Sequence, residues 1–168
     1  MSTEQNLIKE LITLLANKRL DQEEISRITE VVTRAYHDPE GYIYSEEDGD
    51  MSWLLETDPE GITTWAIYSE LIAFFIISDK IDEFHEQVQE PFEGGPIPDF
   101  PYGQFPSTDE YFVWINKLLK AMPQGYQLIS FGDSYGDNLQ GIIVDRADTH
   151  KIMALCQTLN VKSSESFY

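Results

Sequence analysis

Positive charge, cysteine and long apolar runs are all scarce in this chain of 168 residues. It contains 11 lysine and arginine residues against 30 aspartate and glutamate residues, so its formal net charge is -19. Binding to a nucleic-acid backbone or to an anionic membrane surface depends mainly on lysine and arginine, so neither partner is expected. No stretch approaches the roughly 20 unbroken apolar residues of a membrane-spanning helix, and the first residues lack the basic region of a signal peptide.

The single cysteine, Cys156, excludes an intramolecular disulfide and any zinc site built from several cysteines. It lies among Ile152, Leu155 and Leu159, which follow helical spacing. This pattern favours a buried thiol in the core over a nucleophile. We therefore expect a bacterial protein of the cytoplasm, and no cofactor is predicted.

Apolar and aromatic residues are abundant, at 42% and 12% of the chain, which is typical of a globular protein and not of a disordered one. The length suits one domain, so we predict a single domain over residues 1–168. Within it we expect a helical hairpin at 1–37, an acidic loop at 38–61, and an α+β body at 62–168 with a proline-rich insert at 91–107. The second helix of the hairpin should begin after Asp21, because an N-cap aspartate is followed three residues later by a glutamate.

The body alternates predicted strands and helices. The segments that predict strands, the last of them a closing edge strand, are 73–77, 126–131, 139–144 and 161–168. The helices expected between them begin at Asp79, at Ser107 and at Asp145 or Asp148. This order is that of a split βαβ, ferredoxin-like unit, so we predict an α+β fold with an antiparallel sheet of three or four strands.

The negative charge is concentrated in the middle of the chain. Residues 35–116 contain nineteen acidic residues and one basic residue, Lys80, whereas five acids and five bases balance in residues 111–168. The stretches 38–60 and 79–110 therefore form a negative band. A basic protein partner is favoured, since opposite potentials steer encounter; solubility alone is the alternative explanation.

Aromatic residues embedded in this band predict contact anchors. The predicted partner-binding residues are Tyr42, Tyr44, Glu46, Glu47, Asp48, Asp50, Trp53, Asp99, Phe100 and Tyr102. A non-enzymatic, immunity- or inhibitor-like protein-interaction module fits this pattern. A homodimer through the N-terminal helices is a further expectation.

The stretch FGDSYGDNLQGIIV is dense in carboxylates and glycines. A calcium loop that began at Asp133 would need glycine at its sixth position and glutamate at its twelfth, where Asn138 and Val144 stand. Gly132 and Gly136 can instead adopt positive φ angles. The sequence therefore predicts a hairpin turn.

No nucleophile elbow, phosphate loop or dinucleotide fingerprint is present in the sequence. The stretch HEQVQ, which begins at His85, departs from the HExxH zinc signature because Gln89 replaces the second histidine, and we predict a solvated polar helix face there. One alternative function stays open, a carboxylate-based enzyme or a divalent-metal-binding protein centred on Asp79, Asp133 and Asp137. Asp79 directly follows the stretch AFFIIS, which contains a predicted buried strand, and functional side chains often lie at the end of such a strand.

Two family resemblances rest on residues 65–159. The features that carry the first are Trp65 with Leu71, the strand ending in Asp79 and Lys80, Leu118 and Leu119, GYQLISFGDSYGDNLQGIIV, and the apolar helix from Ile152 to Leu159. Their order resembles a bacterial family of small acidic α/β domains of unknown function, from which the insert between Glu90 and Ser107 departs. The hairpin FGDSYGD before an apolar strand is similar to SUKH-type immunity domains, although the upstream Asn-Gly element is lacking. That similarity implies toxin neutralisation by direct binding.

Overall fold

A computed structural model describes residues 1–45, 50–93 and 95–167, which form eight α-helices and one four-stranded sheet. The helices are α1 (Thr3–Leu15), α2 (Gln22–His37), α3 (Pro39–Ser45), α4 (Trp53–Thr57), α5 (Ile62–Glu70), α6 (Ile81–Gln89), α7 (Thr108–Ala121) and α8 (Thr149–Thr158). The strands are β1 (Phe75–Ser78), β2 (Tyr126–Phe131), β3 (Leu139–Asp145) and β4 (Ser163–Ser164), and the short 3-10 turns are η1 (Pro59–Gly61), η2 (Ile72–Phe74), η3 (Glu90–Phe92) and η4 (Arg146–Asp148). Among these residues, no helix is both long and apolar enough to cross a membrane. The predicted α+β class is confirmed.

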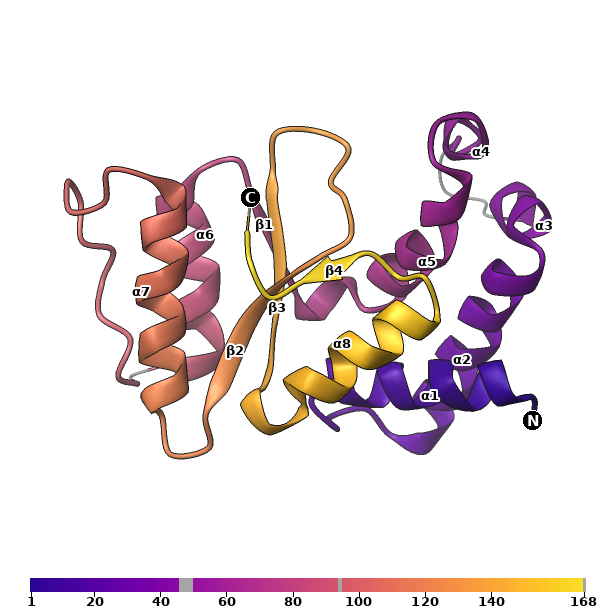
Figure 1. The fold of residues 1–168 in the computed structure, drawn as a ribbon, viewed down its shortest axis with the longest axis horizontal. Helices are drawn as coiled ribbons and strands as arrows, with labels where there is room; N and C mark the ends of the chain where they lie inside the picture. Colours follow the sequence, from indigo (N-terminus) through magenta and orange to yellow (C-terminus); the bar gives the residue numbers. More distant parts are fainter. Residues whose placement is uncertain (46–49, 94, 168) are drawn as a thin grey trace.

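The sheet is antiparallel, with the strand order β1-β3-β2-β4 (Figure 1). β3 pairs with both β1 and β2, so these two strands run parallel with β3 between them. The connection from β1 to β2 carries α6 and α7, which gives the split βαβ unit. The last strand joins the sheet beside β2, where Ser163 and Ser164 face Phe131 and Ser130.

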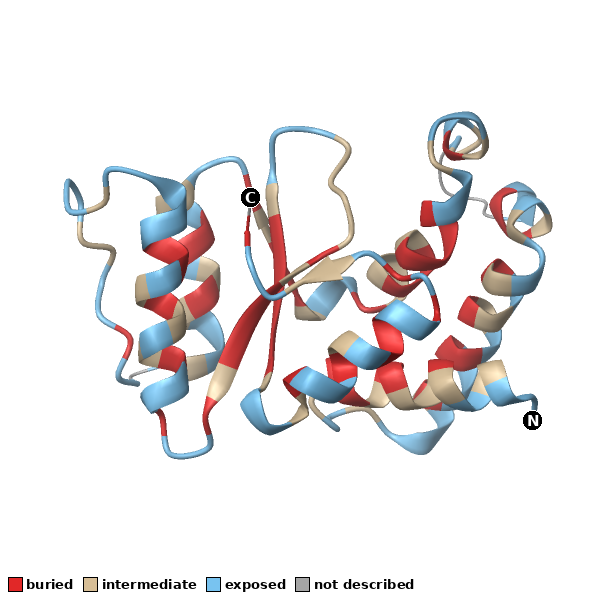
Figure 2. Cartoon of the chain, viewed as in Figure 1, coloured by how far each residue is buried: buried red, intermediate tan, exposed pale blue. Residues whose placement is uncertain are grey.

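Helices cover both faces of the sheet (Figure 1). α6 and α7 pack on one face, and α1, α2, α5 and α8 lie on the other side. Successive strand residues point to opposite faces, so Ile129 belongs to the core under α1 and α8, whereas Leu128 belongs to the core under α6 and α7. Figure 2 shows buried residues along the strands and on the sides of the helices that face them.

The N-terminal hairpin forms as predicted. The Asp21 carboxylate accepts a hydrogen bond from the Glu24 N–H at 2.9 Å and caps α2. The apolar stripe of α1, including Leu11 and Leu15, is fully buried against α2 and α8. The apolar stripe of α1 is therefore already covered by α2 and α8 of the same molecule.

The acidic loop predicted at 38–61 is largely helical where the structure describes it, in α3, α4 and η1. Asp38 starts α3 by accepting a hydrogen bond from the Gly41 N–H at 3.0 Å. Tyr42 and Ile43 are buried in the main core. Tertiary packing of these two side chains stabilises a helix that is too short and too polar to form alone.

Amide side chains cover the exposed backbone at both edges of the sheet. On β1, Gln87 from α6 donates to the Ile77 carbonyl at 2.9 Å and accepts from the Ile77 N–H at 3.1 Å. On β2, beyond the reach of β4, Asn116 from α7 donates to the Leu128 carbonyl at 3.2 Å and accepts from the Leu128 N–H at 2.8 Å. Each amide thus replaces one residue of a missing neighbouring strand.

The thiol of Cys156 lies in the core, as predicted, and burial raises its pKa to about 11. We expect a thiol-specific disulfide reagent to label native protein at neutral pH at least about 100-fold more slowly than urea-unfolded protein, because labelling requires opening of α8. Absorbance of the released chromophore measures both rates. Rapid stoichiometric labelling of the native protein would contradict this burial.

Candidate interaction surface

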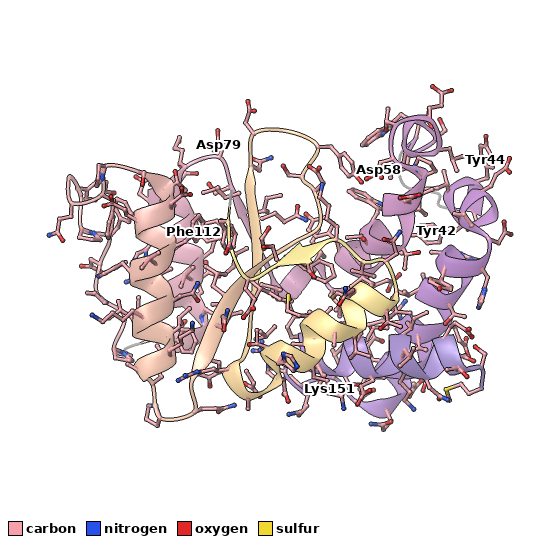
Figure 3. All side chains as sticks on the ribbon, in the orientation of Figure 1. Tyr42, Tyr44, Asp58, Asp79, Phe112 and Lys151 are labelled. Atoms are coloured by element: carbon pink, nitrogen blue, oxygen red, sulfur yellow. The ribbon has the colours of Figure 1, made fainter. Side chains whose placement is uncertain are left out.

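The two stretches predicted to form one negative band lie at opposite ends of the long axis of the molecule (Figure 1). α3 and α4 lie at one end, whereas α6, α7 and the segment 95–107 lie at the other. Tyr44 and Asp58 mark the first end in Figure 3, far from Phe112 on α7. The stretches 38–60 and 79–110 of the negative band therefore do not form one continuous face, because the sheet and its helical layers separate them.

The end formed by α3, α4 and η1, described over residues 38–45 and 50–60, is here called the acidic end. Its exposed carboxylates are Asp38, Glu40, Asp50, Glu56 and Glu60. The sequence contains no lysine or arginine between residues 38 and 60. None of these five carboxylates forms an ion pair with any residue that the structure describes. The negative potential of this end is therefore not compensated locally.

Two of the three aromatic residues predicted as anchors in this stretch reach the surface. Tyr44 is 68% exposed and Trp53 is 38% exposed. Tyr42, by contrast, is only 1% exposed and packs in the core, with the Arg34 guanidinium 5.8 Å from the centre of its ring. The prediction that Tyr42 contacts a partner is wrong, since the apolar side of α3 points inward at this position.

Four predicted acidic contact residues lie between α3 and α4. Glu46, Glu47 and Asp48 lie outside the described residues. Asp50 is exposed, and its carboxylate accepts a hydrogen bond from the Ser52 N–H at 3.0 Å. A hydrogen bond from the Ser52 hydroxyl, together with this one from the Ser52 N–H, holds the pKa of Asp50 below its ordinary value.

The loop between β2 and β3 is the predicted hairpin turn, although one of its glycines is not used as expected. Gly132 has a φ of 75°, but Tyr135, and not Gly136, adopts the second positive φ, at 53°. The Asp133 carboxylate accepts a hydrogen bond from the Tyr135 N–H at 2.8 Å and stabilises this conformation. The turn thereby directs the Tyr135 side chain away from the hairpin.

Tyr135, in the loop between β2 and β3, connects the acidic end to the sheet. Its hydroxyl donates to the Asp58 carboxylate at 2.8 Å, and its ring meets the ring of Trp53 edge to face, with centroids 4.9 Å apart. Asp58 also accepts from the Gly61 N–H at 3.1 Å and caps η1. The carboxylate-rich loop that the sequence offered as a binding site therefore positions two residues of the acidic end.

The carboxylates of the metal or enzyme alternative do not form a cluster. Asp133 forms an ion pair with Lys162 at 2.7 Å, and this partner holds its pKa below the usual range. Asp79 and Asp137 are exposed. Asp79 does not cap α6, since Lys80 stands at the N-cap position. Within the described ranges, no three histidine, cysteine, aspartate or glutamate side chains lie close enough to hold a metal ion.

The predicted contact residues at the other end belong to the proline-rich segment. Asp99 is exposed, and Tyr102 is 72% exposed with its hydroxyl donating to Asp82 at 3.1 Å. Phe100 is half-buried and packs on the ring of His85, with centroids 5.7 Å apart. Phe100 therefore contributes mainly to packing beneath this segment.

His85 is fully buried, so the prediction of a solvated helix face around it is wrong. Its Nε2 lies 2.8 Å from the Pro98 carbonyl oxygen, and its Nδ1 lies 3.0 Å from the Tyr111 hydroxyl. A carbonyl oxygen can only accept, so Nε2 carries the proton and Nδ1 of the neutral ring accepts from Tyr111. His85 thus connects α6, α7 and the proline-rich segment. Its partner Pro98 lies thirteen residues later in an irregular segment, so no periodic pattern in the sequence predicts this contact.

Comparison of the chain with models of known protein families, with curated proteins and with solved structures finds no match. The two family resemblances stay predictions, and the function has to be argued from the surfaces of the molecule.

Proposed function

We propose that this protein is a non-enzymatic interaction module whose acidic end binds a basic protein partner. One observation carries the proposal. Exposed carboxylates that form no ion pair with a described residue, and the exposed rings of Tyr44 and Trp53, occupy the same end of the molecule. The charges accelerate encounter with a cationic surface, and the aromatic rings supply desolvated contact area after docking.

The contacts of Tyr135, from the β2–β3 loop, with Asp58 and Trp53 favour tight binding at this end. Tyr135 holds Asp58 and the Trp53 ring in fixed positions, so less side-chain freedom is lost when a partner docks. A preformed acidic surface that covers a basic one is how an immunity- or inhibitor-like protein would block a cationic toxin or enzyme.

The opposite end supports the proposal less well. Its stretch contains Lys80, which pairs with Glu83 at 2.6 Å. Tyr102 donates its hydroxyl to Asp82, so its polar tip already has a partner. We therefore assign the basic partner to the acidic end.

The test selects binding peptides from a random displayed library, with the intact protein as bait. Enriched peptides should be rich in lysine and arginine, and their affinity should fall steeply as ionic strength rises. The double variant Glu56→Lys with Glu60→Lys, and separately Trp53→Ala, should each weaken binding by about tenfold, because they remove steering charge and a central anchor.

The matched control is Glu86→Lys with Glu90→Lys, which makes the same change in net charge at the opposite end. It should leave the affinity within about twofold, since exposed charges farther apart than a Debye length are screened. Enriched peptides without net positive charge would refute the proposal. Equal losses in the two double variants would refute it too, since binding would then follow net charge alone.

A further inference from the structure

A groove of about 650 Å³ lies beside α7, between this helix and the C-terminal residues 165–167. It exists because β4 is only two residues long and pairs with Ser130 and Phe131. The first half of β2 therefore has no strand neighbour on this side. Asn116 and Gln127 line the groove at that place.

Three cations line this groove, which is here called the α7 groove: Lys117, Lys120 and Arg146. All three are exposed, and none forms an ion pair with a residue in the described ranges. Of the eight other cations, five form such pairs, namely Lys18, Arg27, Lys80, Lys151 and Lys162, whereas Lys9, Arg19 and Arg34 form none with a described residue. Two carboxylates, Asp109 and Glu165, also line the groove. Its lining therefore carries a net charge of +1, in a chain whose net charge is -19.

The helix dipole accounts for only part of this arrangement. Lys120 lies in the last turn of α7, where a cation is favourable. Arg146 comes from η4, and the stem of its side chain packs over Gly125, next to the C-terminal end of α7. A cation from a separate element completes the group, which the dipole of α7 does not explain.

An apolar hollow of about 390 Å³ lies on the other side of α7. Phe105 and Trp114 line it, with ring centroids 5.2 Å apart. Asp109, Val113 and Lys117 line both the hollow and the α7 groove. Val113 is 73% exposed, so a bound molecule could cross α7 over this side chain and contact both depressions.

We propose that the outer face of α7 binds an acidic peptide segment. Carboxylates of the segment contact the three cations of the α7 groove, and one apolar side chain enters the hollow beside Trp114. Charge complementarity selects this occupant, because three cations that form no ion pair with a described residue line one groove, where they outnumber the two carboxylates. This site is separate from the acidic end and has the opposite sign.

The peptide is recognised through its side chains and not as an added strand. Strand addition needs free backbone groups on the sheet edge, and both backbone groups of Leu128 are already bonded to Asn116. A long polyanion is disfavoured, because Asp109 and Glu110 line the hollow and the whole molecule repels negative charge. A short segment with a few carboxylates fits the site best.

The probe is a fluorescein-labelled peptide that contains four glutamates and one central tryptophan, titrated into the intact protein at physiological salt. We expect saturable binding, seen by fluorescence anisotropy. Lys117→Glu with Arg146→Glu should weaken it by at least about tenfold, and Val113→Asp by a similar factor. A peptide with serine in place of the tryptophan should bind about tenfold more weakly.

The matched control replaces Lys9 and Lys151, on α1 and α8, by glutamate, which makes the same change in net charge across the sheet from α7. This variant should leave the affinity for the peptide within about twofold. Lys151 and Phe112 mark the two regions in Figure 3. Equal weakening by this control, or no binding by the wild type, would overturn the proposal. So would tighter binding of a single-stranded oligonucleotide than of the peptide. The acidic-end variant Glu56→Lys with Glu60→Lys should retain peptide binding, so either site can fail without the other.

Discussion

Replacement of Phe167 by alanine is expected to lower the free energy of unfolding by about 3 kcal/mol, at the low end of the range for a buried phenylalanine. Phe167 is buried although it lies three residues beyond the end of the short strand β4. Its ring stacks on Phe112, with centroids 3.7 Å apart and planes at 4°. The loss falls at the low end because the irregular segment that carries Phe167 can shift into part of the space left by the ring. Urea unfolding followed by circular dichroism measures it.

Gly141 in β3 leaves the space for this ring. A Cβ atom at position 141 would lie 2.8 Å from the Phe167 Cζ and 2.9 Å from the Ile129 carbonyl oxygen. Gly141→Ala should therefore destabilise the wild type, and should cost less in the Phe167→Ala background, where one of the two conflicts is gone. Ser166→Ala, at an exposed neighbouring position, is the control. A loss below about 1 kcal/mol for Phe167→Ala, the size of an ordinary substitution, would contradict the docking of this segment.

The second large effect is expected at His85. His85→Phe should lower the free energy of unfolding by about 2–3 kcal/mol, because it keeps most of the volume but leaves the buried Tyr111 hydroxyl without its acceptor. The Pro98 carbonyl loses less, since Gln89 also donates to it at 3.0 Å. Denaturant unfolding measures the loss, and faster chymotrypsin cleavage within residues 98–105 should accompany it.

A double variant separates the hydrogen bond from the packing. Adding Tyr111→Phe to His85→Phe removes both polar partners and should recover at least half of the lost stability, since replacing both partners by apolar groups of similar shape can be nearly neutral. Tyr111→Phe alone should be destabilising, as it leaves His85 Nδ1 without a donor. A double variant that is as unstable as the sum of the two single variants would contradict this interpretation.

Sequence patterns predicted the elements that depend on local signals. The caps at Asp21 and Ser107 begin α2 and α7, and the runs at 126–131 and 139–144 are β2 and β3. The helical character of α3 and α4 was missed, because these helices are stabilised by side chains that pack against distant parts of the chain and not by their own periodicity.

Charge counting predicted the sign of the surface but not its distribution. The stretches 38–60 and 79–110 are both acidic, yet the fold carries them to opposite ends. Residues 111–168 contain five acids and five bases, so a charge count did not predict that cations outnumber carboxylates in the α7 groove. Lys117 and Arg146 are separated by two strands in the sequence, and only the β2–β3 hairpin brings them to one groove.

The amide caps on β1 and β2 have a consequence for self-association. A growing cross-β fibril needs an outer strand whose N–H and C=O groups are free to template the next chain. Gln87 and Asn116 occupy those groups at Ile77 and Leu128. Addition of a strand from another molecule at Ile77 or Leu128 would therefore require one of these amides to be released first, even when charge repulsion between the molecules is screened.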